Sequence, residues 1–504
     1  MVTQTLQDII GKEPHHWRGD RDGIEEFNQT FVNLQGADAM LDAGQMQALE
    51  GFLATIAFPP NPFRNRDNSL PNPLPLPGHV FTGIGGAPGE PLPDGNAVFG
   101  LGIFRNHHLV QGFRVSCSFC HTLPTGVGTN SNFSGGSGVP VPPGPNGEMH
   151  HAVVFSTLSE TPSFSIKIPH LRNQHEKVGF DLMSPRSLAG FGFMHDGSVD
   201  SLVRFLSEPF FVFGSGIDGT PAAKLAGMVA FLLSLSGSDL PVNQGIPQAV
   251  SGPSSRDAHA AAGEQLTVDG ANAQDPDTVA WLDAMIALDD AVQDAFAPGP
   301  EVSLVARGRR GGLDRGFAHV GGGMFQSDRA GETATAEGLR TSSSAGSELT
   351  FTVVPQGTAL RIGIDRDEDG ALDRDELDAC SDPADATSVP VPCALTIPSL
   401  RLARAGEGIV LSWGAAGVSH DVVRGDLDAL RGTGGDFTVA VEECLADDLE
   451  APAFTWNGAP GSGSSFFLVR SLCLGAAATY ESGTAGQIAP RAPGIAAAPA
   501  ACLD

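Results

Sequence analysis

Five consecutive residues of this chain have the types and spacing needed to hold a metal cofactor covalently. Cys117-Ser118-Phe119-Cys120-His121 reads Cys-x-x-Cys-His, the attachment motif for c-type haem. Both thiols can add to the haem vinyl groups, and His121 (proximal ligand) then lies next to the iron. A disulfide or half of a zinc site would use the same residues, but a zinc site needs a second close pair of ligands. The other cysteines offer no such pair, so we expect one covalent haem c.

The sixth position of the iron has four candidate ligands. A methionine sulfur raises the reduction potential, a second histidine lowers it, and an open position permits small-molecule chemistry. Met183 is the first candidate, because it lies in a loop between the segments that follow the haem motif. Met194, His195 and His16 are the alternatives.

A second stretch with ligand chemistry spans residues 365–376 and matches the calcium-loop pattern D-x-D-x-D-G-x₅-E. Its candidate ligands are Asp365, Asp367, Asp369, the backbone carbonyl of Ala371, Asp373 and Glu376. A solvated acidic turn would not need all these matched positions, so we expect a structural calcium ion. The residues before the loop, 360–364, have β-type composition and predict an entering strand. The loop is therefore similar to those of thrombospondin-type-3 and dockerin-like modules, with an extracellular affinity of roughly 10⁻⁴–10⁻³ M.

Composition excludes some classes of function. The net charge is −29 and the chain has few lysines, so phosphate backbones should repel it and nucleic-acid binding is not expected. No apolar run is long enough to span a membrane. The acidity also fits attraction to a basic redox partner.

Periodicity and turn residues outline the elements that position these sites. Helices are expected over residues 22–34, 42–56, 96–108, 199–206, 221–235 and 277–296. Strands are expected over 349–354, 359–364, 409–413, 437–441 and 465–470. The stretch 125–147, dense in Gly, Pro, Ser and Asn, predicts a loop without regular structure. Ser198 or Asp200 is the expected N-cap of the helix near residue 199.

Two segments after the haem motif resemble a known superfamily. Residues 167–173 (Lys-Ile-Pro-His-Leu-Arg-Asn) and 192–198 (Gly-Phe-Met-His-Asp-Gly-Ser) are similar to the haem-domain signature of the bacterial di-haem cytochrome c peroxidase/MauG-like superfamily. The resemblance implies an all-α cytochrome c fold with covalent haem. Members of that superfamily need two haems, whereas this chain has one Cys-x-x-Cys-His, which favours electron transfer over peroxidase or oxidase activity.

The expected architecture is multidomain: an all-α, cytochrome c-like haem domain, a calcium-loop connector and a C-terminal β-sandwich that resembles fibronectin type III. The boundaries are 1–94 for an N-terminal helical and Pro-rich segment, 95–245 for the haem domain, 246–394 for the connector and 395–504 for the sandwich and tail. The leading functional hypothesis is an exported mono-haem cytochrome that carries electrons to an unidentified redox partner. The alternatives are a MauG-like peroxidase or oxidase with an open haem site, and a cell-surface structural or adhesion protein.

Cysteine usage indicates a compartment outside the cytoplasm. The five late cysteines, Cys380, Cys393, Cys444, Cys473 and Cys502, lie near β-like sequence and predict disulfides. Cys380 and Cys393 flank one loop and could close it. We expect a periplasmic or extracellular, outer-surface protein of a bacterium. No signal peptide is visible at the start of the sequence, so a truncated N-terminus or another export route is expected.

Overall fold

The structure is a computed structural model that describes most of the chain. The described residues are 5–17, 21–106, 116–127, 131–134, 137–140, 152–155, 164–177, 192–194, 197–209, 211, 213, 218–240, 255–292, 299–379, 381–388, 400–406, 408–414, 419–449, 451–458, 463–473, 476–477, 479–481 and 490–502. The chain divides into two compact units. Unit 1 comprises Met1–Glu264, Ala287–Val302 and Val353–Gln356, and unit 2 comprises Gln265–Ile286, Ser303–Thr352 and Gly357–Asp504. Within the described residues, no helix is both long and apolar enough to cross a membrane.

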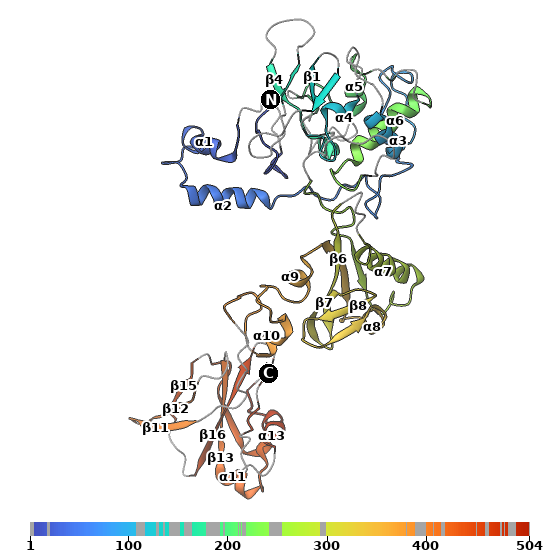
Figure 1. Cartoon of the computed structure of the whole chain (residues 1–504). Coiled ribbons are helices and arrows are strands. Elements are labelled where there is room, and N and C mark those ends of the chain that lie inside the picture. The colour runs from blue at the N-terminus through green and yellow to red at the C-terminus, as the bar shows by residue number, and fades with distance from the viewer. Residues whose placement is uncertain are drawn as a thin grey trace. The chain divides into compact units, whose positions relative to one another are not determined.

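Two helices, α3 (Ala97–Asn106) and α6 (Pro221–Ser234), pack closely side by side in unit 1 (Figure 1). Helix α6 begins where the side chain of Thr220 accepts a hydrogen bond from the backbone of Ala223. The two helices touch at glycines, because a Cβ atom on Gly100 would run into the backbone of Gly227. This close approach buries apolar side chains of both helices in one core.

Unit 1 contains other helices within its described residues. They are η1 (Ile24–Phe27), α1 (Asn28–Asn33), α2 (Ala43–Ala54), α4 (Cys117–Cys120), η2 (Gln174–Glu176) and α5 (Leu202–Leu206). Helix α2 confirms the prediction over 42–56, since Asp42 and Gln45 form a reciprocal capping box at its start. Ser201 caps α5, so the expected caps Ser198 and Asp200 were wrong by one to three residues.

The prediction of an all-α haem domain was wrong. Two antiparallel pairs lie within residues 95–245: β1 (Ser131–Ser134) with β2 (Ser137–Pro140), and β3 (Ala152–Phe155) with β4 (Phe164–Lys167). The first pair also contradicts the unstructured loop expected over 125–147. The β-branched and aromatic residues of β3 and β4 favour strands. The high content of Gly, Pro, Ser and Asn over 125–147 had been taken as a sign of a loop.

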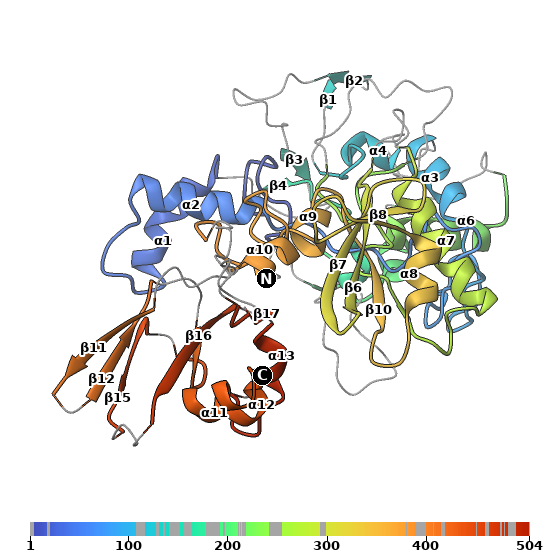
Figure 2. The same cartoon turned by 90° about the horizontal axis from the view of Figure 1, so that it is seen from below.

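Unit 2 contains a six-stranded antiparallel sheet of order β5-β10-β6-β7-β8-β9 (Figure 2). Its strands are β5 (Gln265–Val268), β6 (Val302–Arg310), β7 (Leu313–His319), β8 (Met324–Ser327), β9 (Thr333–Thr335) and β10 (Leu349–Pro355). Strand β10 confirms the prediction over 349–354. The rings of Phe325 and Phe351 pack with centroids 5.8 Å apart in the core. Two helices, α7 (Pro276–Asp289) and α8 (Ala336–Ser342), accompany the sheet.

The segment before the calcium-type loop is a helix, α9 (Ala359–Gly363), and not the predicted strand. The backbone N–H groups of Ile364 and Asp365 both donate to the carbonyl of Leu360, which closes a helical turn. Five residues are too few for composition alone to separate a strand from one turn of helix. A second helix, α10 (Asp373–Ala379), follows the loop.

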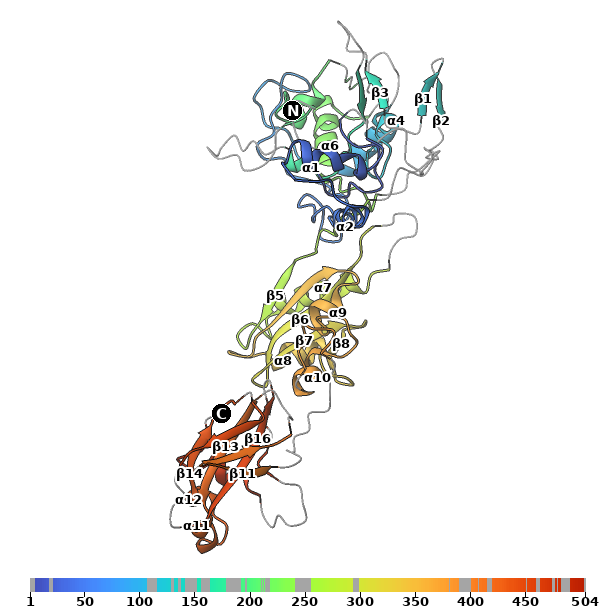
Figure 3. The ribbon, with the colours of Figure 1, turned by 90° about the vertical axis from the view of Figure 1, so that its left-hand side faces the viewer.

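The C-terminal region consists of two antiparallel sheets, as expected (Figure 3). One is β11 (Arg401–Ala405), β12 (Gly408–Ser412) and β15 (Ala453–Trp456); the other is β14 (Val441–Ala446), β13 (Ser419–Asp426), β16 (Ser465–Cys473) and β17 (Ala476–Ala477). Leu411, Trp413, Val422 and Trp456 lie in their shared core, which confirms a buried tryptophan.

Residues 437–441 do not form the predicted strand. Phe437–Ala440 is helix α12, because the side chain of Asp436 caps the backbone N–H of Thr438. Two further helices, α11 (Leu427–Gly432) and α13 (Ala492–Ala496), complete this region. A disulfide joins Cys444 to Cys502 and fastens the end of the chain to β14. Cys380 and Cys393 lie outside the described residues.

Candidate functional site

The Cys-x-x-Cys part of the haem motif is one turn of helix, α4, beginning after Ser116. The hydroxyl of Ser118 donates to the carbonyl of Arg105 at 3.2 Å, which ties α4 to the end of α3. Cys117 is buried and Cys120 is partly buried, and both thiols are free. Burial raises the pKa of the Cys117 thiol to about 12 and that of Cys120 to about 11. The two sulfurs are therefore protonated thiols on adjacent parts of a single turn.

His121 ends this turn, and one of its ring nitrogens is committed to the backbone. Nδ1 lies 2.9 Å from the carbonyl oxygen of Gly126 and 3.1 Å from that of Pro169. Because both partners are acceptors, Nδ1 carries the proton and the lone pair lies on Nε2. Burial lowers the pKa of His121, which keeps the imidazole neutral. A neutral imidazole with a free Nε2 lone pair is the form that ligates iron.

Both carbonyls that orient His121 are themselves held in place. Gly126 has φ +71°, a conformation that favours glycine, and a Cβ there would press on Leu171. The backbone N–H of Leu171 donates to the carbonyl of Thr125 at 3.1 Å. The segment that carries Pro169 is thus bonded directly to the loop that carries Gly126.

Residues 168–173 are anchored at their far end as well. The backbone N–H of Asn173 donates to the carbonyl of Leu235 at 2.8 Å, just beyond α6. Arg172 is 2% exposed and forms an ion pair with Asp8, while its guanidinium lies 4.3 Å from the ring centroid of Phe58. Residues 167–173 were selected from the sequence only because they resemble the haem-domain signature. The structure adds a physical role, because the carbonyl of Pro169 accepts a hydrogen bond from His121 Nδ1.

The candidates for the sixth ligand are not brought to one place by the described residues. Met183 and His195 lie outside them. Met194 is 41% exposed and has φ +64°, next to the bridge between Phe193 and Val199. His16 is exposed and packs edge-on against Phe27, with centroids 4.8 Å apart. The choice among these residues stays a prediction.

The chain around the motif fits a haem. Cys117 and Leu123 belong to the same buried apolar cluster as Phe104 and Phe193. A porphyrin needs such apolar walls, two thiols and one nitrogen with an accessible lone pair. The chain supplies the two thiols, an imidazole whose Nδ1 is hydrogen-bonded, and apolar side chains in the same cluster as Cys117.

The acidic loop connects α9 to α10 and folds around its own carboxylates. The backbone N–H groups of Gly370 and Ala371 donate to the side chains of Asp365 and Asp369 at 3.2 and 2.7 Å. Gly370 has φ +96°, as the sharp turn at the sixth loop position requires. One oxygen from each of Asp365, Asp367 and Asp369 lies within 4.8 Å of the others.

Several of these oxygens are buried without a hydrogen-bond donor. They are Asp365 Oδ1, Asp367 Oδ2 and both Oε atoms of Glu376. Glu376 is 0% exposed. Burial, followed by repulsion from Asp367, Asp369 and Asp373, raises the pKa of Glu376 to about 7. Burial likewise raises the pKa of Asp365. Buried, unpartnered carboxylate oxygens are costly unless a cation neutralises them, and an all-oxygen set with Asp373 and the Ala371 carbonyl suits calcium.

Helix α10, which follows this loop, is hydrogen-bonded to the turn between β8 and β9 in unit 2. The backbone N–H of Arg374 donates to the carbonyl of Asp328 at 2.8 Å, and that of Ala330 donates to the Asp375 carboxylate at 2.7 Å. Arg329 also forms an ion pair with Asp378. The turn between β8 and β9 is therefore fastened to the helix that supplies Glu376.

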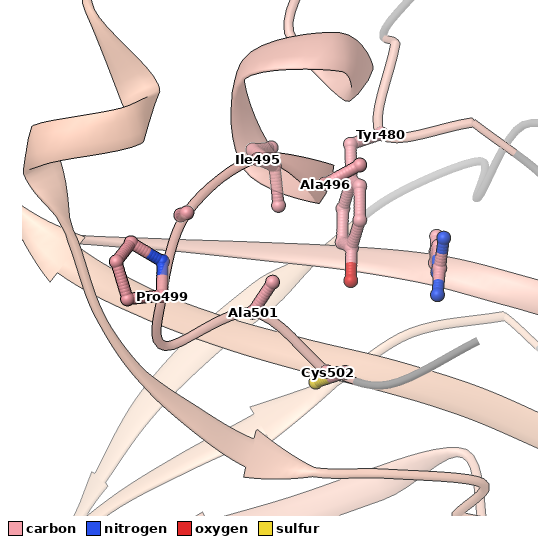
Figure 4. A pocket seen from close by; sticks show the side chains of 8 residues that line it. Tyr480, Ile495, Ala496, Pro499, Ala501 and Cys502 are labelled. Carbon is pink, nitrogen blue, oxygen red and sulfur yellow. The ribbon is translucent and has the colours of Figure 1, made fainter.

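A small pocket in the C-terminal region was not foreseen from the sequence. It is lined by Tyr480, Ile495 and Cys502, with the guanidinium of Arg470 5.1 Å from the Tyr480 ring centroid (Figure 4). Arg470 is itself paired with Asp421 at 2.7 Å. The pocket lies beside the Cys444–Cys502 disulfide.

The backbone acceptors of Gly126 and Pro169, and the buried Asp8, were also missed by sequence reasoning. A carbonyl acceptor leaves no mark in residue type, and Asp8 lies 164 positions from the arginine it pairs with. The chain matches no protein-family model, and no curated protein or solved structure is similar to it.

Proposed function

We propose that this chain is an exported c-type cytochrome that carries electrons through one haem attached at Cys117 and Cys120. The observation that carries the proposal is the state of His121. Its Nδ1 is taken by two backbone carbonyls, which leaves Nε2 as the nitrogen that would ligate iron, and Cys117 and Cys120 on the same turn are free thiols. A bound haem would supply a reversible one-electron iron couple.

The chain's own residues would orient, shield and hold that group. Cys117 and Cys120 would form thioether bonds, and His121 would hold the iron through Nε2. Leu123 and Phe193 lie in the apolar core that would exclude water from the haem face. The carbonyls of Gly126 and Pro169 would keep the imidazole in one orientation during each change of charge.

The proposal is tested by producing the chain in a bacterial host with the c-type haem attachment machinery. We expect one haem per chain that survives denaturation, and a reversible redox wave. Cys117→Ser and Cys120→Ser together should abolish covalent haem, whereas Cys502→Ser should leave the haem content unchanged. A wild-type chain without covalent haem would refute the proposal, and turnover of peroxide would move the function to the peroxidase or oxidase class.

We also propose that residues 365–376 bind one structural calcium ion. The support is the set of buried oxygens of Asp365, Asp367 and Glu376 that have no hydrogen-bond donor. Calcium would bring positive charge to oxygens that repel one another, and would join α9 to α10. Calorimetric titration of the chelator-treated protein should give a single site, and Glu376→Gln should remove it.

A further inference from the structure

A buried ion pair remote from the haem motif is joined to the proximal histidine by a short chain of contacts. Asp8 has a fully buried side chain and pairs with Arg172, whose side chain is 2% exposed. The same carboxylate accepts from the backbone N–H of Arg256 at 3.0 Å and from Lys12 Nζ at 3.3 Å. Arg172 also donates to Ser255 Oγ at 3.1 Å. The Arg172 guanidinium is therefore held by both the Asp8 carboxylate and the Ser255 hydroxyl.

Arg172 lies three positions after Pro169, whose carbonyl accepts from His121 Nδ1 at 3.1 Å. The backbone on both sides of Arg172 is held, because the N–H of Leu171 donates to the carbonyl of Thr125 and that of Asn173 donates to the carbonyl of Leu235. The backbone N–H of Arg172 also meets Nδ1 of His170 at 3.2 Å. Arg172 is therefore connected to the Pro169 carbonyl through a short stretch of backbone with fixed hydrogen bonds.

We propose that the Asp8–Arg172 ion pair positions His121: it sets the hydrogen bond between Nδ1 and the Pro169 carbonyl, and through it the properties of the iron. The inference rests on the proposed haem function. A strong hydrogen bond at Nδ1 makes the imidazole a better electron donor and favours oxidised iron. Loosening that bond therefore raises the reduction potential.

Two variants distinguish a role of the Asp8–Arg172 pair in positioning His121 from a general effect of that pair on the stability of the fold. Asp8→Asn removes the charge that holds Arg172 at nearly constant volume. Lys12→Met is the matched control, because Lys12 contacts the same carboxylate but is not part of the segment that carries Pro169. Both variants remove a buried charge partner, so both should lower the unfolding midpoint. If Asp8→Asn does not fold, Asp8→Asn combined with Arg172→Met removes both charges of the Asp8–Arg172 pair and leaves fewer buried charges to rearrange than Asp8→Asn alone.

The first measurement is the reduction potential of the haem-loaded protein. We expect Asp8→Asn, or the double variant, to change the ratio of oxidised to reduced iron at a fixed potential by about tenfold, which is about 59 mV upward for one electron. Lys12→Met should leave the potential unchanged. An unchanged potential in Asp8→Asn, or an equal shift in Lys12→Met, would overturn the positioning role while the haem function stands.

The second measurement needs no haem. In the apo-protein, hydrogen exchange of the His121 Nδ1–H, followed by NMR, reports the bond to Pro169 directly. Exchange should become faster in Asp8→Asn and stay unchanged in Lys12→Met. If the wild-type chain takes up no haem, the proposed function fails, and this exchange experiment still decides the positioning role: equal exchange in wild type and Asp8→Asn would exclude it.

Discussion

Replacing Glu376 by Gln tests whether the buried carboxylates of the acidic loop form a calcium site. Glu376 is 0% exposed, and neither of its carboxylate oxygens has a hydrogen-bond donor. Burial and three neighbouring aspartates raise its pKa from 4.5 to about 7. Without an ion, the ionised form is therefore disfavoured in the folded chain, and stability falls as the pH rises from 4.5 through about 7.

The size of this loss of stability follows from the pKa shift of Glu376. At about 1.4 kcal/mol per pKa unit, an ion-free chain at about pH 8 loses about 3 kcal/mol by keeping Glu376 ionised. A glutamine removes the charge but buries an amide that needs partners of its own, so the net gain is about 1–2 kcal/mol. In chelator, Glu376→Gln should thus be more stable than the wild type.

With calcium bound, the wild type should instead be more stable than Glu376→Gln. With a dissociation constant of about 10⁻⁴ M, about 10 mM calcium is about 100 times that value and stabilises the wild type by about 2.7 kcal/mol. The variant lacks the bidentate ligand and should gain less than about 1 kcal/mol. Because α10 is bonded to Asp328 and Ala330, the gain should appear in the unfolding of the six-stranded sheet.

The assay is urea unfolding followed by far-UV circular dichroism, with calcium and with chelator. Glu368→Gln is the matched control, since Glu368 lies in the same loop, is exposed and occupies no ligand position. It should retain the wild-type calcium response. The reasoning fails if Glu376→Gln is destabilised equally in both media, or if both variants respond to calcium alike.

Three other predictions concern stability. Arg64 donates to the backbone carbonyls of Ser234 at the end of α6 and of Ser238 and Asp239 beyond it, so Arg64→Met should cost about 3–5 kcal/mol in urea unfolding. Arg66→Met breaks a partly exposed ion pair with Glu264 and should cost less than about 1 kcal/mol; equal losses would contradict this contrast. Burial lowers the pKa of His175 from 6.5 to about 4, so the unfolded chain takes up the proton first, and stability should fall by about 1–2 kcal/mol as the pH drops through this interval. His175→Gln should flatten that slope, and an unchanged slope would exclude His175 as its source. Cys502→Ser opens a disulfide spanning 58 residues and should cost about 4 kcal/mol in the C-terminal region; a loss below about 1 kcal/mol would show that the disulfide adds little.

Helices with strong local signals were predictable. The helix expected over 42–56 is α2, which begins after Asp42, and the apolar run after Pro221 is helix α6. Segments without such signals were not. Residues 359–363 and 437–440 carry β-type side chains but form helices, because one backbone turn and one aspartate cap outweigh composition over so few residues.

The sequence alone determined the local chemistry of this protein. Cys117, Cys120 and His121 are neighbours in the chain, and the candidate ligands from Asp365 to Glu376 lie within one short segment, so spacing was enough to select both sets as candidates. Tertiary structure decided which distant groups act on these sites. The carbonyl of Pro169 reaches His121 across 48 positions, and Asp8 reaches Arg172 across 164. Such contacts arise from how the chain packs, and no residue type or interval in the sequence records them.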